Sequence, residues 1–548
     1  MSEQHAATDQ LRHVARGASL GLAGSAFAAA SGFGLAVVVT RGLNADDAGR
    51  FFAVTSALAL LVAASSFGTE AGLARFLQRL AATGDHRDVD RALAWAVAPT
   101  LTVATVLGAA LAWQAGTVAG WLGLGDAGVP ALRWLALALP AAVAADVLLA
   151  STRGFGRIGP TVVVDRVVRS GVQVAVPLVV LALGGGLLGV VVGWAAAYAV
   201  SASLALLVVA RSLATRSPGR GTPTPGTGGR GVGARFWSFT APRGVGSLAQ
   251  MGIQKSDIVL VAVLLRPVDA ALYAAATRFV PVGQMAVQAL QQVLQPRFTT
   301  ILLTDDHRTL AEVFRVTTAW SVLLAWPLYL VVAAAPASYL ALFGDGYDDA
   351  VPVVVVMCAA MLVAVATGPV DTLLLMAGRS GLSMANALAA LALDLGLCLL
   401  LVPRWGITGA ACAWAVAVVT RCLLATWQVR AELGVAPGRY LARVALLPLA
   451  CFVPVLALGT RSPGPTLLVW LLSGLVATLA YLACLVGLVG RRDDLHLDLV
   501  LPRRRPAPTP TTTATTCSTP TTPDQPEPPE ESDPACGLAT SYAPSATT

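Results

Sequence analysis

Ionisable side chains lie inside segments of this chain that are otherwise strongly apolar. The richest group runs from Arg243 through Lys255 and Asp257 to Arg278. Guanidinium and ammonium groups bind anions, and a carboxylate binds a cation or takes up a proton. An ionisable group at the centre of a bilayer costs roughly 2.5 to 3.5 kcal/mol, so it faces a cavity or a partner. The group therefore predicts either an intramembrane binding site or an ion-pair network that holds helices together.

Three glutamines follow this group at helical spacing. Gln284, Gln288 and Gln291 stand at positions i, i+4 and i+7, which puts them on one face of a helix. In lipid such a polar stripe must point at protein or at a water-filled cavity. A stripe of amides suits a ligand rich in hydroxyl groups, and interhelical hydrogen bonding is the alternative.

Oxygen ligands suited to a cation recur further along the chain. Asp257, Asn386 and Asp394 form our candidate site for a coupling cation or a proton. Asn386 and Asp394 are eight residues apart, or about 80° around a helix. An ion pair between Asp394 and Arg421 is an equally good interpretation. The other ionisable groups near or inside apolar segments are Glu70, Arg75, Asp146 and Asp371.

The amino-acid composition indicates whether these segments are surrounded by water or by lipid. Of 548 residues, 56% are hydrophobic and 12% are charged, and the mean hydropathy is +0.71. Soluble domains carry roughly 25% charged residues, so a soluble globular protein is excluded. Apolar runs of about 20 residues predict membrane-spanning helices. We predict an all-α membrane protein with fourteen spans: 17–40, 51–68, 92–113, 130–150, 162–183, 187–210, 237–265, 272–296, 316–335, 351–376, 382–402, 407–429, 441–458 and 467–490.

The net charge of +7 is explained by orientation in the membrane. A cytoplasmic N-terminus places most of the 37 basic residues on cytoplasmic loops, as the positive-inside rule requires. No basic face with interleaved aromatic residues is present, so nucleic acid is not an expected partner. The prediction is a multi-pass protein of the plasma (inner) membrane with both termini in the cytoplasm.

The chain repeats itself at a shift of 222 residues. This shift aligns Asp47 with Asp269 and Gly156 with Gly378. Six spans separate the copies, so both have the same orientation and form two pseudo-symmetric lobes around a central cavity. The predicted organisation is a cytoplasmic N-terminus (1–16), an N-terminal six-helix lobe (17–210), a flexible linker (211–236), a C-terminal six-helix lobe (237–430), two additional helices (431–490) and a disordered Pro/Thr-rich cytoplasmic tail (491–548).

Catalytic and cofactor motifs are not supported by their context. The sequence GFGRIG at 154–159 matches a dinucleotide fingerprint, but it follows a membrane helix and no βαβ pattern surrounds it. The eight cysteines form no CxxC pair, and the five histidines are scattered. We therefore expect no catalytic residue, no cofactor and no metal site, and we do not expect an enzyme.

Four segments carry a resemblance to a known family. They are TRGLNADDAGRFFAV at 40–54, SDIVLVAVLLRPVDAALYAAATRF at 256–279, LFGDGYDDAVP at 342–352 and the run from LLLMAGRSGL to WGITGAACA at 373–413. In order and spacing they resemble the multidrug/oligosaccharidyl-lipid/polysaccharide (MOP) exporter superfamily, and within it the polysaccharide (O-antigen type) flippases. The resemblance implies alternating-access transport of an undecaprenyl-pyrophosphate-linked oligosaccharide from the inner to the outer leaflet.

The resemblance also implies roles and partners. Cationic residues would face the pyrophosphate, and the glutamine stripe would meet sugar hydroxyls, so the expected substrate contacts are Arg243, Lys255, Arg278, Gln284, Gln288 and Gln291. Expected partners are the lipid-linked oligosaccharide, membrane lipid, a coupling cation or proton, and glycan polymerase and glycosyltransferases. A multidrug or cation antiporter of the same superfamily and a lipid II flippase are the alternatives, and a membrane scaffold or a glycan polymerase is a third class.

Overall fold

The computed structural model describes residues 2–83, 86–157, 159–214, 229–304, 306–435, 438, 440–459 and 467–490. Every regular element in this part of the chain is helical. The first half contains α1 (Ser2–Gly42), α2 (Ala45–Ser66), α3 (Thr69–Thr83), α4 (His86–Trp113), α5 (Ala115–Trp121), α6 (Gly125–Gly154), α7 (Gly159–Thr161), the π-helix η1 (Val162–Arg169), α8 (Ser170–Ala182) and α9 (Leu187–Ala214).

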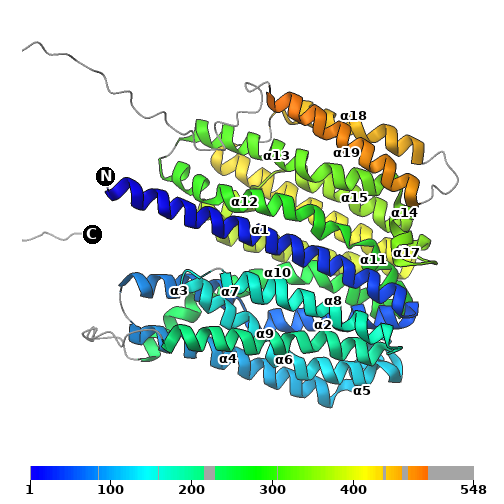
Figure 1. Ribbon diagram of the computed structural model, residues 1–548, viewed down its shortest axis with the longest axis horizontal. Helices are drawn as coiled ribbons and strands as arrows, with labels where there is room; N and C mark the ends of the chain where they lie inside the picture. Colours follow the sequence, from blue (N-terminus) through cyan, green and yellow to red (C-terminus); the bar gives the residue numbers. More distant parts are fainter. Residues whose placement is uncertain are drawn as a thin grey trace, which may run out of the picture. The chain divides into compact units, whose positions relative to one another are not determined.

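The second half contains α10 (Gly229–Leu264), α11 (Pro267–Ala276), α12 (Phe279–Leu303), α13 (His307–Ala334), α14 (Pro336–Leu340), the 3₁₀ turns η2 (Ala341–Phe343) and η3 (Asp348–Ala350), α15 (Val351–Ala366), α16 (Val370–Met376), α17 (Ser380–Leu433), α18 (Tyr440–Gly459) and α19 (Leu467–Gly490). Figure 1 shows these long helices lying side by side as a bundle.

All fourteen predicted spans fall on helices, although several are broken. Gly406 has a non-helical backbone and divides α17 into the two predicted spans 382–402 and 407–429. Within the described residues, nine helices are long and apolar enough to cross a membrane, and two shorter apolar stretches lie in α18 and α19. The multi-helical membrane fold is confirmed, while the count of fourteen crossings stays a prediction.

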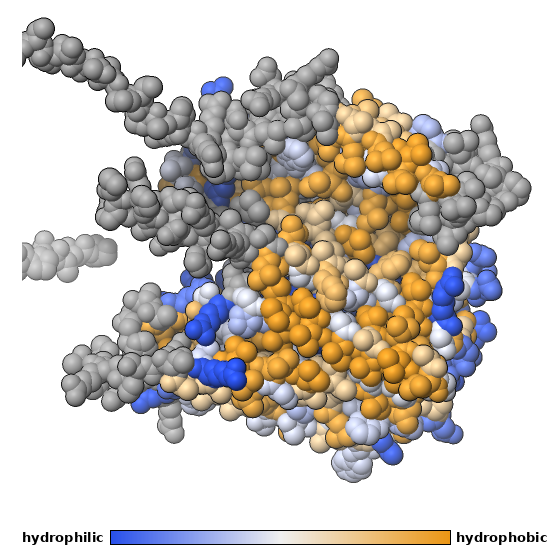
Figure 2. Space-filling view, viewed as in Figure 1, coloured by the Kyte–Doolittle hydropathy of each residue, from blue (hydrophilic) through white to orange (hydrophobic). Residues whose placement is uncertain are grey.

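The surface of the bundle is that of a protein surrounded by lipid. Large apolar side chains are exposed on many helices, including Trp113 at 87% and Leu183 and Leu303 at 82%. Figure 2 shows hydrophobic residues covering much of the visible face of the described bundle. A water-soluble protein of this size does not expose apolar surface on this scale.

The helices on both sides of the predicted linker extend into it. We expected a flexible segment at 211–236, but α9 continues to Ala214 and α10 already begins at Gly229. Both ends are helical because they extend the apolar helices beside them. Residues 215–228 of the predicted linker and the predicted tail at 491–548 lie outside the described residues.

The repeat at a shift of 222 has a counterpart in the backbone. Gly156 and Gly378 have φ values of +74° and +78° at equivalent short turns, a conformation that glycine adopts at low cost. The arginine after each of these glycines contacts the C-terminal end of a long helix, α9 in the first half and α17 in the second. Arg157 donates to the Ser212 hydroxyl at 3.1 Å, and Arg379 pairs with Glu432 at 2.6 Å.

The two halves meet along α2 at one of its ends. A Cβ placed on Gly49 of α2 would lie 1.6 Å from the carbonyl oxygen of Pro267 at the start of α11. Arg41 at the end of α1 donates to the carbonyls of Leu342 and Ala341 at 2.8 and 2.9 Å. Only glycine permits the approach at position 49, so this position fixes how closely the halves pack here.

At the other end of α2 the halves meet through a seam of regularly spaced residues, which runs from Gly68 into α3 on one side and along α10 on the other. A Cβ on Gly68 would lie 2.5 Å from the backbone nitrogen of Gly244, and one on Gly72 would lie 2.2 Å from the Thr240 hydroxyl. One turn further, the Phe76 and Phe236 rings pack edge to face with centroids 5.8 Å apart. The three pairs, Gly68–Gly244, Gly72–Thr240 and Phe76–Phe236, are spaced by four residues on both segments, as expected for antiparallel helices, and we call them the α3–α10 seam.

Candidate functional site

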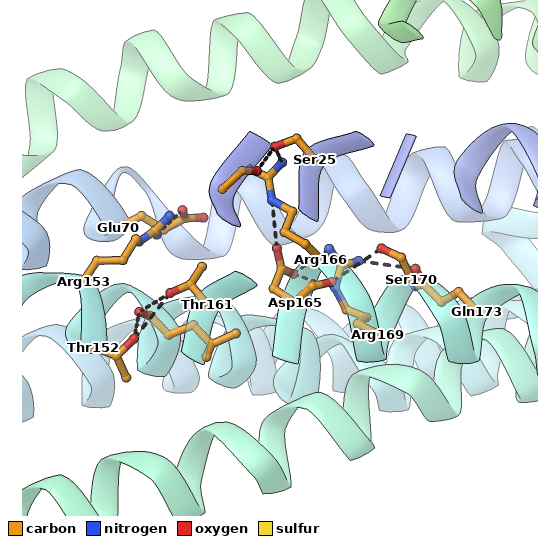
Figure 3. A network of polar contacts seen from close by, with 12 residues as sticks. Ser25, Glu70, Thr152, Arg153, Thr161, Asp165, Arg166, Arg169, Ser170 and Gln173 are labelled. Carbon is orange, nitrogen blue, oxygen red and sulfur yellow. Dashed lines mark hydrogen bonds and ion pairs between the residues drawn. The ribbon is translucent and has the colours of Figure 1, made fainter. Parts of the chain in front are cut away.

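A cavity of about 460 Å³ opens between α2, α3 and α6 of the first half and α10 of the second. Three of the residues that line it are ionisable: Glu70, Asp146 and Arg153. Arg153 donates to the Glu70 carboxylate at 2.9 Å, and Figure 3 shows this pair. The remaining lining residues are Val62, Ala63, Ser66, Gly68, Ala71, Ala74, Ser247 and Met251. The cavity is therefore an intramembrane site that combines charge with small side chains at the junction of the halves.

A second group of charges lies nearby on the π-helix η1. The Asp165 carboxylate accepts from Arg169 at 2.6 Å and lies 3.6 Å from Arg166, which donates to the Ser25 hydroxyl of α1 at 2.7 Å. Arg169 also reaches the Gln173 amide oxygen at 3.4 Å and stacks over the Tyr198 ring. Figure 3 shows this network joining η1 to α1. π-helical turns occur frequently at functional sites.

Our sequence prediction missed the network, although its signal is present. The run VVVDRVVR at 162–169 puts one acidic and two basic residues in the predicted span 162–183. Three charges in one span are unusual in lipid and mark a polar interior. Glu70 and Asp146 were identified as candidates, but nothing in the sequence indicated that Arg153 would pair with a residue 83 positions away.

The basic side chains predicted to contact the substrate lie at two separate places. Arg243 stacks over the Phe239 ring at 4.6 Å, well inside α10 and on the part of the helix that packs against α3. Lys255 is twelve residues further along α10, or about 18 Å along the helix axis. It lies within electrostatic range of Arg278, whose guanidinium stacks over Phe52 of the first half at 5.0 Å.

The glutamine stripe turns mostly toward neighbouring helices. The Gln284 amide points at the Met361 sulfur of α15 at 3.9 Å, and the Gln291 oxygen accepts from the Thr372 hydroxyl of α16 at 3.2 Å. Gln288 between them is exposed. The structure thus places two of the three amides in interhelical contacts and leaves the third accessible.

The predicted coupling residues are buried in the second half. Asp257 accepts a hydrogen bond from the Tyr273 hydroxyl at 2.6 Å and one from the Ile258 N–H at 2.8 Å. Asp394 is fully buried, lies within electrostatic range of Asp257, and one of its oxygens has no hydrogen-bond partner among the described atoms. Asn386 instead exchanges two hydrogen bonds with Gln428, at 2.7 and 2.9 Å. The structure therefore brings the two aspartates together without Asn386.

The alternative ion pair between Asp394 and Arg421 is wrong. Arg421 donates to Asp371 and to the Gln250 side chain, each at 2.6 Å, and so joins α17 to α16 and α10. Within the part of the chain that the structure describes, no group of three or more His, Cys, Asp or Glu residues has the geometry to hold a metal ion.

Comparisons with known proteins agree with this architecture. The family model described as polysaccharide biosynthesis protein matches residues 14–302. No curated protein sequence matches the chain. The solved structure of the lipid II flippase MurJ in an inward closed conformation is similar with a TM-score of 0.67 at 10% identity, over 86% of this chain and 99% of that chain.

Multidrug transporters of the MATE family are similar as well. An inward-facing MATE transporter of the MOP superfamily gives a TM-score of 0.56 at 14% identity, over 76% of this chain and 98% of that chain. The bent form of the Vibrio cholerae transporter VcmN gives 0.52 at 14% identity, over 79% of this chain and 98% of that chain. At these identities the likeness establishes the fold.

Proposed function

The chain belongs to the polysaccharide biosynthesis protein family, and we propose that it is a flippase of the MOP transporter superfamily for a lipid-linked oligosaccharide. In this proposal it moves an undecaprenyl-pyrophosphate-linked oligosaccharide from the inner to the outer leaflet of the plasma membrane, with both termini in the cytoplasm. The oligosaccharide then serves the synthesis of a surface polysaccharide.

The observation that carries the proposal is the charged cavity between the halves. Glu70, Asp146 and Arg153 line a space of about 460 Å³ that residues of both halves enclose. A polar group in a membrane interior is costly unless it lines a pathway or meets a partner. A polar headgroup therefore finds hydrogen-bonding groups here that the lipid interior lacks.

In the proposed mechanism, alternating access uses the two contacts between the halves at the ends of α2. The α3–α10 seam closes one end, and the packing of Gly49 against Pro267 closes the other. Rocking of the halves about the cavity opens one contact while the other stays closed. In this scheme Asp257 and Asp394 take up the coupling cation or proton, while Asn386 pairs with Gln428. Arg243, Lys255, Arg278 and the glutamine stripe meet the substrate.

The class of substrate distinguishes this proposal from the alternative functions. The likeness to MurJ over nearly the whole of that chain makes lipid II the second candidate. Both substrates combine a polyprenyl chain, a pyrophosphate and a sugar headgroup, so the fold accommodates either. The likeness to MATE transporters covers less of this chain, and a drug or cation antiporter is the third outcome.

The test is transport by the purified protein in proteoliposomes. Vesicles receive a fluorescent undecaprenyl-pyrophosphate oligosaccharide in both leaflets, and a membrane-impermeant reagent modifies the outer headgroups. Time-dependent modification beyond the outer-leaflet share, absent from protein-free vesicles, is the expected result. The same assay is carried out in parallel with lipid II as the substrate. Transport of lipid II alone, or of a cationic dye alone, would overturn the proposed substrate.

A further inference from the structure

One carboxylate in the cavity between the halves has no partner among the described residues. Asp146 of α6 lines this cavity and is partly exposed, yet it forms no hydrogen bond or ion pair there. The other charges within its electrostatic range are matched to one another. Arg153 donates to Glu70 at 2.9 Å, and Arg169 donates to Asp165 at 2.6 Å. Because a carboxylate inside a membrane protein is costly without a partner, Asp146 is available to a positively charged ligand.

Two more polar groups of this cavity lack a partner. Ser66, at the end of α2, lines the cavity and is only 5% exposed, and its hydroxyl oxygen has no hydrogen-bond partner among the described atoms. The Nε–H of Arg153 has none either, although the same guanidinium donates to Glu70 through another nitrogen. A buried polar group without a partner destabilises a fold. Each of the two therefore indicates a ligand that supplies the missing contact.

The three unpartnered groups match the chemistry of an amino sugar. An ammonium group donates three hydrogen bonds, which the Asp146 carboxylate and the Ser66 hydroxyl accept, while the Arg153 Nε–H donates to a sugar oxygen. A bare metal ion needs acceptors alone, and within the described residues no group of three or more His, Cys, Asp or Glu can hold one. The volume of about 460 Å³ lies within the range of small-molecule sites, roughly 300 to 1,000 Å³.

We infer that Asp146, Ser66 and Arg153 bind an amino sugar whose amine is not acetylated. The inference rests on the proposed function, because that function brings the sugar headgroup of a lipid-linked oligosaccharide into this cavity. The amine meets Asp146 and Ser66, and a ring hydroxyl meets Arg153. This site narrows the substrate class to oligosaccharides that carry a positively charged sugar.

Binding of two methyl glycosides to the purified full-length protein in lipid nanodiscs tests the site. The probes are methyl glucosaminide and methyl N-acetylglucosaminide, which differ only in the acetylation of the amine. The pH is chosen so that the free amine is protonated. Methyl glucosaminide is expected to bind about tenfold more tightly, because it gains one charge-assisted contact. Equal binding of the two probes by the natural chain would overturn the site.

Three variants show whether the preference comes from the named residues. Asp146→Asn keeps the size of the side chain and removes its charge, so the two probes should then bind within about twofold of one another. Ser66→Ala should reduce the preference about threefold without lowering the melting temperature, because the hydroxyl has no partner in the described structure. Asp126→Asn is the matched control, at an exposed position of the same helix as Asp146, and should keep the full preference. A preference that survives in both Asp146→Asn and Ser66→Ala would overturn the site.

Competition by salts separates a sugar amine from an inorganic cation. Sodium chloride and choline chloride at equal concentration screen charges equally, so equal and weak competition with methyl glucosaminide is expected. Much stronger competition by sodium than by choline would assign Asp146 to an inorganic cation and overturn the inference.

Failure of the site and failure of the proposed function give different results. The proteoliposome assay receives two lipid-linked oligosaccharides that differ in one acetyl group. Equal transport of both lipids, together with equal binding of both probes, upholds the function and overturns the site. Binding that prefers the free amine and depends on Asp146, in a chain that transports neither lipid, upholds the site and overturns the function.

Discussion

The two halves of the molecule share their turns but differ in their chemistry. Gly156 and Gly378 adopt the same left-handed conformation, and Arg157 and Arg379 contact the C-terminal ends of α9 and α17. The ionisable residues inside the helices do not follow the repeat. At a shift of 222, Asp146 corresponds to Gly368, and Asp165 corresponds to Ala387. Duplication therefore accounts for the scaffold, and each half has its own set of charges.

The two sets of charges also differ in exposure. In the first half, the Arg153 and Glu70 side chains are 35% and 46% exposed and line the cavity. In the second half, Asp257 and Asp394 are 4% and 0% exposed and lie beside Tyr273 and Cys398. A charge beside a cavity is available to a large polar substrate, whereas a buried carboxylate suits only a small ion or a proton. We propose on this ground that the accessible charges at the cavity join the second-half cations in meeting the substrate, and that the two buried aspartates serve coupling.

The largest expected effect on stability comes from Gly49, a position where the two halves have different residues. Gly49 corresponds to Ala271, which is buried. Gly49→Ala places a methyl group 1.6 Å from the Pro267 carbonyl oxygen, so α2 and α11 must separate, at a cost of about 3 kcal/mol or more. The measurement is the melting temperature of the purified protein in detergent.

The reciprocal change is the control for this prediction. Ala271→Gly adds backbone freedom and removes one methyl group, which costs about 1 kcal/mol. Its melting temperature should fall much less than that of Gly49→Ala. Equal losses would mean that the halves are not held at the distance set by Gly49.

The second prediction concerns coupling in the second half. Asp257→Asn and Asp394→Asn keep the shape of the side chain but remove the charge that attracts a cation or binds a proton. Transport in vesicles should lose its stimulation by an ion gradient by about tenfold, within the usual range of coupling energies. Asp126→Asn, at an exposed position of α6, should retain the stimulation. The assignment of coupling to this half is wrong if the stimulation is unchanged in both variants.

The sequence predicted the scaffold better than the site, for physical reasons. Apolar runs and turn glycines are local signals, so the helices and the equivalence of Gly156 with Gly378 followed from the sequence alone. Pairings between distant positions are not local. Arg421 pairs with Asp371 and not with Asp394, and Arg153 pairs with Glu70, because the packing of whole helices selects the partners. The close approach at Gly49 depends in the same way on the partner helix α11.

The third prediction compares the Glu70–Arg153 ion pair at the cavity with the less exposed Asp371–Arg421 ion pair. Neutralising the first-half pair, as Glu70→Gln with Arg153→Gln, should lower the initial transport rate about fivefold, the loss of roughly 1 kcal/mol of interaction with a polar substrate. The melting temperature should change little, since a half-exposed pair stabilises a fold by only about 0 to 1 kcal/mol. Asp371→Asn, which breaks a less exposed pair with Arg421, should lower the melting temperature more. Equal decreases in melting temperature would mean that the Glu70–Arg153 pair stabilises the fold and does not serve the substrate.

The smallest effect on stability is expected at the equivalent turns, where the two halves are most alike. Arg157 and Arg379 follow equivalent glycines and differ only in their partners, a hydroxyl for Arg157 and a carboxylate for Arg379. Because the Arg379 side chain is 59% exposed, solvent screens its ion pair, and Arg379→Ala should cost less than about 1 kcal/mol. Arg157→Ala removes a hydrogen bond from a charged donor to an uncharged hydroxyl, of similar strength at about 1 kcal/mol. The two variants should therefore melt within a few degrees of one another, and added salt should weaken only the effect of Arg379→Ala, because only that contact joins two opposite charges. A large loss from one variant alone would show that the repeated turns support the two halves unequally.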